Sequence, residues 1–283
     1  MALDTGVLIL VLCAAALHAT WNALVKAGGD RLVMTTLVMF GPAPVCMAAL
    51  FVLPPLAPAA WPFLLLSTAI HYVYYALLIG AYTHGDLSQV YPISRGAAPA
   101  LVAVAAWVFV GEALSGAEIA GVVIVSAGIM SLAWRRGVRA AAETRALVLA
   151  MLNAGAIASY LIADGMGVRL AGEPLTYIAW LFVLEALPLL GFTLWRRRGR
   201  IAAAFGPRLK LGLFGGLIAG LSYGITIWAM SRGPMAHIVA LRETSVLMGA
   251  ALGILVLKEP FGRHRLAAAT VVAGGAILLN SGL

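Results

Sequence analysis

LSQVYPISRGAAPALVAVAAWVFVGE, residues 87–112, is an apolar stretch that carries a single arginine, Arg95, and ends in a glutamate. PMAHIVALRETSVLMGAALGILVLKE, residues 234–259, repeats this arrangement with Arg242 in the place of Arg95. In both stretches the arginine precedes the final glutamate by 17 residues, and the two arginines are 147 residues apart in a chain of 283. A charge inside an apolar membrane segment is costly and is usually functional. The two stretches therefore indicate a duplicated protein with a matched pair of internal charges.

The composition is that of a membrane protein. Hydrophobic residues make up 63% of the chain and charged residues 11%, against roughly 25% charged residues in soluble domains. The net charge of +8 does not indicate nucleic-acid binding, because the basic residues cluster in short loops between apolar segments. Cys13 and Cys46 both lie inside apolar segments, so no disulfide framework is expected.

Ten apolar segments have the length of membrane-spanning helices, about 20 residues each. They are residues 5–25, 32–53, 60–82, 87–110, 115–134, 145–163, 174–195, 209–230, 234–257 and 262–280. We read the first as a retained span, because Asp4 stands where a signal peptide has basic residues. We therefore expect an all-α integral membrane protein with ten transmembrane helices.

The loop charges predict how the chain crosses the membrane. With the N-terminus outside, the inner loops contain 15 of the 19 basic residues, the outer loops contain Arg169 and Arg232, and the two internal arginines make up the rest. Cytoplasmic loops are enriched in lysine and arginine. This count favours both termini outside, in a multi-pass protein of a bacterial inner membrane.

The matched arginines belong to a longer internal repeat. Further matches at offsets of 147 or 148 residues are Glu112 with Glu259, Gly128 with Gly275, and Tyr75 with Tyr223. Five spans per half is an odd number, so the second half must cross the membrane in the opposite sense. We expect two inverted five-helix repeats, residues 1–137 and 138–283, around a central cavity, with binding near the midplane as in many transporters.

Each internal arginine needs compensation for a cost of roughly 2.5–3.5 kcal/mol on insertion scales. Each lies about 12 Å inside its span at 1.5 Å per residue, which is close to the midplane. In one interpretation the arginines are paired internally, with Glu243 reaching Arg95 across the repeat interface or with Glu185 as a partner. In the other they hold a substrate carboxylate or phosphate by bidentate contacts, and Glu243 competes with the substrate. The sequence leaves both open.

Two prolines flank Arg95 in the fourth segment. Pro92 and Pro99 each remove a helical hydrogen bond, and a broken helix beside an internal charge is typical of a transporter binding site. We therefore predict an interrupted fourth span that carries the specificity, with Arg95 as the ligand contact and Arg242 as the switch. The alternative is a packing kink.

Other polar residues inside the spans extend the candidate site. His18 and Asn22, and likewise His71 and Tyr75, are four residues apart and share a helix face. The predicted substrate-binding residues are Arg95, Arg242, Glu243, Tyr91, Tyr75, Tyr223, His71, His18, Trp21 and Asn22. The alternative for the tyrosines and histidines is a role as hydrogen-bonded packing residues.

The sequence contains no enzyme motif, no phosphate loop and no metal-type cluster of cysteines and histidines. We expect no enzymatic activity, no catalytic residue, no metal and no cofactor.

The chain resembles the EamA-like transporters of the drug/metabolite transporter (DMT) superfamily over essentially its whole length. The residues that carry the resemblance are Gly111-Glu112 with Gly121 and Gly128, Lys258-Glu259 with Gly274-Gly275, and the run of residues 17–26. The resemblance implies a helical basket with a central cavity and transport, often export, of amino acids or other small metabolites. Members studied in eukaryotes have cytoplasmic termini, which is opposite to the loop-charge count.

The small multidrug-resistance relatives in that superfamily carry a glutamate in the middle of their first span, where this chain has no acid. This difference argues against a lipophilic-cation exporter, and the two arginines argue for an anionic or zwitterionic substrate. We therefore expect a secondary transporter, an exporter, of a small metabolite such as an amino acid or organic acid, working by alternating access. The alternative is a lipid or glycolipid flippase or scramblase of the same architecture. The expected partners are the small-molecule substrate, the lipid bilayer and a coupling proton or counter-substrate, without nucleic acid; monomer and homodimer both remain open.

Overall fold

The computed structural model describes residues 3–27, 30–84, 87–133, 142–248 and 263–281, and every regular element in these ranges is a helix. In chain order the elements are α1 (Thr5–Ala27), α2 (Arg31–Phe40), α3 (Ala43–Ala49), η1 (Pro58–Ala60), α4 (Trp61–His84), α5 (Leu87–Ala105), η2 (Ala106–Val110), α6 (Gly116–Ser131), α7 (Ala142–Leu170), α8 (Pro174–Arg196), α9 (Ile201–Phe205), η3 (Gly206–Arg208), α10 (Leu209–Met230), α11 (Met235–Arg242) and α13 (Arg263–Asn280). The predicted boundary at residues 137 and 138 and the predicted Lys258-Glu259 motif lie outside the described residues.

Seven helical segments are long and apolar enough to cross a membrane. Two further apolar helices, Gly116–Ser131 and Leu266–Asn280, are shorter, and the segment predicted at 234–257 is described only to residue 248. The protein is therefore an all-α, multi-pass membrane protein. The seven qualifying segments correspond to predicted spans, but the count of ten stays a prediction.

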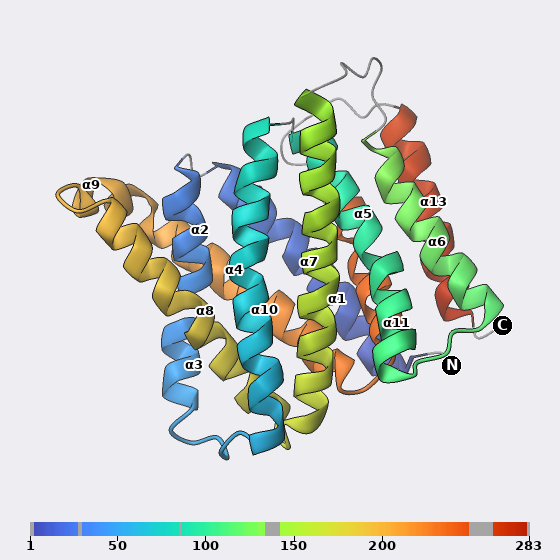
Figure 1. The fold of residues 1–283 in the computed structure, drawn as a ribbon, viewed down its shortest axis with the longest axis horizontal. Helices are drawn as coiled ribbons and strands as arrows, with labels where there is room; N and C mark the ends of the chain where they lie inside the picture. The colour runs from blue at the N-terminus through green and yellow to red at the C-terminus, as the bar shows by residue number, and fades with distance from the viewer. Residues whose placement is uncertain (1–2, 28–29, 85–86, 134–141, 249–262, 282–283) are drawn as a thin grey trace.

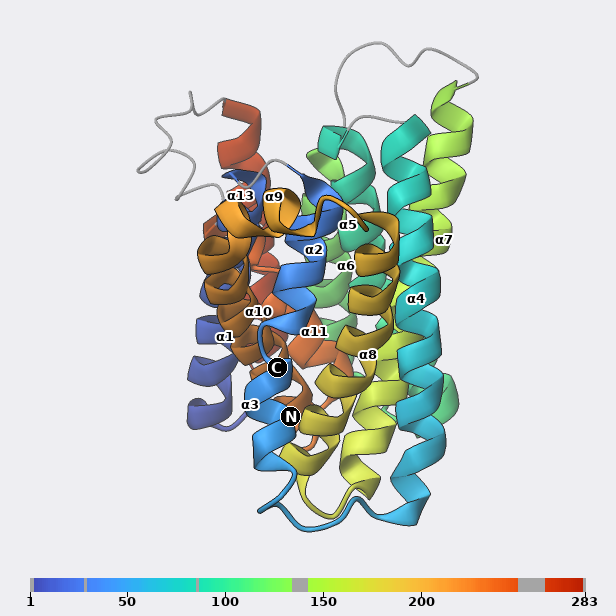
Figure 2. The same ribbon diagram turned by 90° about the vertical axis from the view of Figure 1, so that its left-hand side faces the viewer.

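The long helices pack side by side into a bundle, with α1 against α10, α4 against α7, α5 between α6 and α7, and α6 against α13 (Figures 1 and 2). The two ends of the chain meet, because the backbone N–H of Leu3 donates to the Asn280 side chain at 3.4 Å. Both termini therefore lie on the same face, as an even number of crossings requires.

Two surface ion pairs mark the two ends of the bundle. On the face of the termini, Arg169 bonds Glu112 at 2.6 Å and also donates to the Gly233 carbonyl. At the opposite end, where the arginine-rich α8–α10 connection lies, Arg197 bonds Asp30 at 2.7 Å (Figure 2). The basic loop of residues 196–208 is thus on the face opposite to the termini.

Glycines allow α6 and α13 to cross closely. A Cβ on Gly121 would lie 2.9 Å from the Leu279 backbone nitrogen, and one on Gly275 would lie 2.9 Å from the Val125 backbone nitrogen. Gly274, next in sequence, has no neighbouring atom within 4 Å of such a Cβ. Of the Gly274-Gly275 pair in the motif, Gly275 is therefore the residue on which this helix crossing depends.

The predicted interruption of the fourth span is wrong. α5 continues through both Pro92 and Pro99 as one helix, since helices packed on either side support a backbone that lacks single hydrogen bonds. Helical bonding changes instead after Arg242, where Thr244 N–H bonds the Leu241 carbonyl at 3.0 Å, three residues back. The Thr244 hydroxyl bonds the same carbonyl at 2.6 Å. Both matched stretches are therefore irregular, the first only after α5, in the π-helical turn η2, and the second directly beside its arginine.

Candidate functional site

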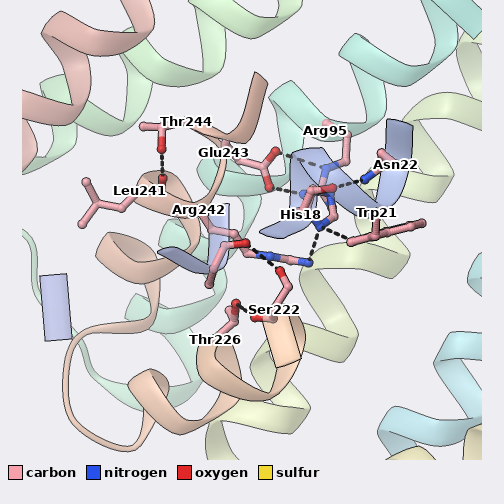
Figure 3. Close-up of polar contacts among 11 residues, drawn as sticks. His18, Trp21, Asn22, Arg95, Ser222, Thr226, Leu241, Arg242, Glu243 and Thr244 are labelled. Carbon is pink, nitrogen blue, oxygen red and sulfur yellow. Dashed lines mark hydrogen bonds and ion pairs between the residues drawn. The ribbon is translucent and has the colours of Figure 1, made fainter. Parts of the chain in front are cut away.

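Arg95 and Glu243 form a buried ion pair in the centre of the bundle (Figure 3). Arg95 Nη2 donates to Glu243 Oε1 at 2.6 Å and Nε donates to Oε2 at 3.1 Å, so the contact is bidentate. The two residues are 5% and 1% exposed. Arg95 lies on α5, and Glu243 is placed by the irregular turn that follows α11. One of the two interpretations of the sequence, an ion pair across the halves, is therefore present for Arg95.

His18, on α1, lies between the two arginines (Figure 3). Arg95 Nη2 is 3.5 Å from His18 Nε2, and Arg242 Nη2 is 3.2 Å from His18 Nδ1. Trp21 Nε1 also donates to His18 Nδ1, at 3.3 Å. A neutral imidazole accepts a hydrogen bond at one ring nitrogen only, and the two donors at Nδ1 make it the acceptor. His18 therefore serves Arg242 as a neutral acceptor and supplies no countercharge.

Arg242 lacks a carboxylate of its own among the residues that the structure describes. Its side chain is 5% exposed, and its Nε and Nη1 atoms make no hydrogen bond to a described residue. Its guanidinium carbon lies 5.2 Å from the centre of the Tyr223 ring. A cation–π contact contributes about 0.5–2 kcal/mol, less than the cost of placing an arginine in a membrane core. The Arg242 guanidinium is thus a buried cation with unused hydrogen-bond donors.

A buried carboxyl, Asp164, lies on the other side of Tyr223. The Tyr223 hydroxyl donates to Asp164 Oδ2, and the Tyr177 hydroxyl donates to Oδ1 at 3.0 Å. Asp164 is completely buried. Asp164 is absent from the predicted site because the predicted span of residues 145–163 ended one residue before it, whereas α7 continues to Leu170. An apolar segment that resumes after an isolated acid is the signal that could have found it.

Aromatic rings fill the space around Tyr223. The His71 ring stacks on Tyr160 at 4.0 Å between ring centres, and its centre is 6.0 Å from that of Tyr223. His71 Nδ1 also lies 3.0 Å from Glu185 Oε1. The structure therefore brings His71 and Tyr223 into one cluster with Tyr160 and with the acids Asp164 and Glu185.

The other predicted residues have more local contacts. The Tyr75 hydroxyl donates to Met39 Sδ at 2.8 Å, which directs it to a neighbour on α2. The Asn22 amide donates to the His18 carbonyl of its own helix at 2.7 Å, and Tyr91 lies one turn before Arg95 on α5. Among the described residues, no group of three or more His, Cys, Asp or Glu side chains is placed to hold a metal ion.

A hollow lies away from the arginines, at the end of the bundle where the termini lie. Its volume is about 220 Å³, and its lining includes Glu112, Glu118, Pro234 and His237. Glu112 closes this end of the bundle, since its Oε2 accepts the Met235 backbone N–H at 2.8 Å. With both arginines 5% exposed, the central cluster is closed to solvent in this conformation, and the central cavity stays a prediction.

A membrane-crossing helical bundle with charged and aromatic side chains at its centre defines a multi-pass membrane protein with a polar core. Residues 144–281 match the sequence model of the EamA-like transporter family, so this part of the chain is similar to EamA-like transporters. No curated protein matches the sequence. A solved crystal structure is similar over 97% of this chain and 98% of that chain, with a TM-score of 0.76 and 18% sequence identity, which shows the shared fold alone.

Proposed function

We propose that the protein transports a small anionic or zwitterionic metabolite, such as an amino acid or organic acid, with Arg242 as the residue that binds the anionic group. The observation that carries this proposal is the difference between the two arginines. Arg95 forms two hydrogen bonds to Glu243, whereas Arg242 keeps two nitrogens without hydrogen bonds to described residues. This assignment exchanges the roles that the sequence suggested, because Arg95 was expected to contact the ligand.

A carboxylate or phosphate fits this position chemically. A guanidinium presents paired N–H donors in a plane and binds such oxyanions in a bidentate manner. His18 holds the Nη2 edge of Arg242 and Tyr223 covers its face, so the guanidinium is held in place for a ligand. Export, the direction that the family resemblance implies, is the direction that we expect.

The packing of the helices supports a proposal of two inverted repeats that work by alternating access. An exchange of the two halves pairs α1 with α7 and α4 with α10, so the observed packing of α1 on α10 corresponds to that of α4 on α7. Each end of the bundle has its own ion pair, Glu112–Arg169 or Asp30–Arg197. In our proposal these pairs hold the two ends closed, and each opens in turn.

Uptake by proteoliposomes tests the proposal. The purified protein is reconstituted and offered radiolabelled amino acids, dicarboxylates and sugar phosphates, each with protein-free liposomes as background. We expect uptake of at least one compound by the wild type and by Arg232→Gln, and a loss of at least tenfold in Arg242→Gln. Arg232 is an exposed control whose guanidinium lies over Trp228.

Uptake that is equal in Arg242→Gln and the wild type would refute the role of Arg242. If no compound enters while fluorescent phospholipids exchange between leaflets in the same vesicles, the alternative, a lipid flippase or scramblase, replaces the transporter proposal.

A further inference from the structure

The buried charges in the centre of the bundle do not balance. Two arginines, Arg95 and Arg242, share the core with three acids, Glu243, Asp164 and Glu185, all at most 5% exposed. Burial of an uncompensated charge is far more costly than burial of a neutral group. A neutral core therefore requires one additional proton, carried by one of the three acids or by His71, which lies 3.0 Å from Glu185.

Hydrogen bonds indicate where this proton lies. Glu243 is bound to Arg95, and Asp164 accepts hydroxyl donors at both of its oxygens, as ionised carboxylates do. Glu185 Oε1 makes no hydrogen bond to a described residue, although it lies 3.0 Å from His71 Nδ1. His71 Nδ1 is also 2.9 Å from the Ser67 carbonyl, which occupies its N–H. The additional proton is thus assigned to Glu185 and His71, which are neutral as a pair, and the charge count assigns Asp164 as the ionised acid that balances Arg242.

Tyr223 connects that countercharge to the proposed anion site. Its ring lies against Arg242 and its hydroxyl bonds Asp164. A substrate anion at Arg242 would supply the negative charge that Asp164 supplies in its absence. With both present, the core would carry one excess negative charge.

We propose that Asp164 is the proton-binding residue of this transporter, ionised when the Arg242 site is empty and protonated when an anion occupies it. One proton, taken from the aqueous phase, then moves together with each anion in the same direction. The proposal rests on the anion site of the proposed function, and it makes the protein an anion–proton symporter.

Asp164 belongs to a central cluster of residues from several helices. Those that titrate or carry charge are His18 on α1, His71, Tyr74 and Tyr75 on α4, Arg95 on α5, Tyr160 on α7, Tyr177 and Glu185 on α8, Tyr223 on α10, Arg242 on α11, and Glu243 directly after α11. The tyrosines are hydroxyl donors and His71 and Glu185 are neutral as a pair in this assignment. Arg242 is linked to Asp164 through one residue, Tyr223, and in our proposal neutralisation of Arg242 changes the protonation of Asp164.

Infrared spectroscopy tests the proposal without a substrate. Arg242→Gln removes the positive charge that a bound anion would neutralise. We therefore expect Asp164 to take up a proton in this variant. We expect the variant to gain a deuterium-sensitive carboxylic acid C=O band relative to the wild type at neutral pH. The band should be missing from Arg242→Gln/Asp164→Asn and kept in Arg242→Gln/Glu173→Gln, whose altered residue caps the start of α8. No new band, or a band that survives Asp164→Asn, would overturn the proposal.

Proteoliposomes with an internal pH dye test the coupling for whichever radiolabelled compound of the panel enters. We expect an inward acid gradient to stimulate wild-type uptake, and one proton to enter with each molecule. Asp164→Asn should retain uptake, but the acid gradient should no longer stimulate it. Glu185→Gln should keep the wild-type ratio of protons to transported molecules. Two results would disprove the proton site and leave the anion transporter intact. One is Arg242-dependent uptake that does not change with the pH gradient, and the other is uptake by Asp164→Asn that the acid gradient still stimulates. Loss of the Arg242 dependence would instead refute the proposed function.

Discussion

Glu243 and Arg95 are bonded to each other by two hydrogen bonds, of 2.6 and 3.1 Å, across 148 residues of sequence. The first half of the chain thus supplies the cation and the second half the anion. Breaking a buried ion pair by removing one partner leaves an uncompensated charge and costs about 3–5 kcal/mol.

Glu243→Gln should therefore destabilise the protein by about 3–5 kcal/mol. Arg95→Gln should cost less, because the carboxyl left behind can take up a proton whereas a guanidinium cannot lose one. Denaturant unfolding in detergent measures the free energy of unfolding of both variants. The double variant Arg95→Gln/Glu243→Gln completes the double-mutant cycle, which gives the coupling energy of the pair. A coupling energy indistinguishable from zero would contradict the ion pair.

Arg242→Gln should not lower stability, in contrast to Glu243→Gln. The substitution removes a buried charge that has no carboxylate partner among the described residues, and Asp164 can compensate by binding a proton. The melting temperature of the purified variant should equal or exceed that of the wild type. A loss as large as that of Glu243→Gln would show that Arg242 is a structural residue with a partner.

Tyr223→Phe should cost about 1.5–3 kcal/mol, the contribution of a hydrogen bond to a charged group, because it removes the hydroxyl that donates to Asp164. Tyr75→Phe is the matched control, since the Tyr75 hydroxyl donates to a methionine sulfur, a weak acceptor. Unfolding of the two variants side by side should show the larger loss for Tyr223→Phe. Equal losses would mean that the Asp164 carboxyl is not ionised in the folded protein.

Gly275→Ala should destabilise the crossing of α6 and α13 by about 1–3 kcal/mol, the usual cost of overpacking. The added Cβ would lie 2.9 Å from the Val125 backbone nitrogen, which cannot move without the helix. Gly274→Ala adds the same atom into open space and should raise helix propensity without a clash. We expect the melting temperature of Gly275→Ala to be lower than that of Gly274→Ala. A Gly275→Ala protein as stable as Gly274→Ala would contradict the close crossing of α6 and α13.

Periodicity and composition were sufficient to predict a helical membrane protein, because apolar segments of this length have few alternatives. The burial of Arg95, Arg242 and Glu243 also followed from their positions in apolar stretches. The break after Arg242 did not, since it depends on local bonding of Thr244 in its tertiary setting, whereas the prolines of α5 gave a stronger signal at the wrong place. Asp164 was missed because a single acid ended a hydropathy segment that the helix itself continues through.

Our proposal of Arg242 as the anion-binding residue did not follow from the sequence, because the two arginines are equivalent by spacing. Only the three-dimensional contacts distinguish them: Glu243 points across the bundle to Arg95 and leaves its neighbour Arg242 to His18 and Tyr223 (Figure 3). Adjacent residues on a helix point about 100° apart, which agrees with this choice of partner.

A thermal-shift measurement with small anions tests the role of Arg242 most directly. A ligand at 100 times its Kd stabilises the folded state by about 2.7 kcal/mol, and binding requires no assumption about direction or coupling. We predict that at least one amino acid, dicarboxylate or sugar phosphate raises the melting temperature of the wild type and of Arg232→Gln, and leaves that of Arg242→Gln unchanged. Equal stabilisation of Arg242→Gln and the wild type by the same compound would contradict the account.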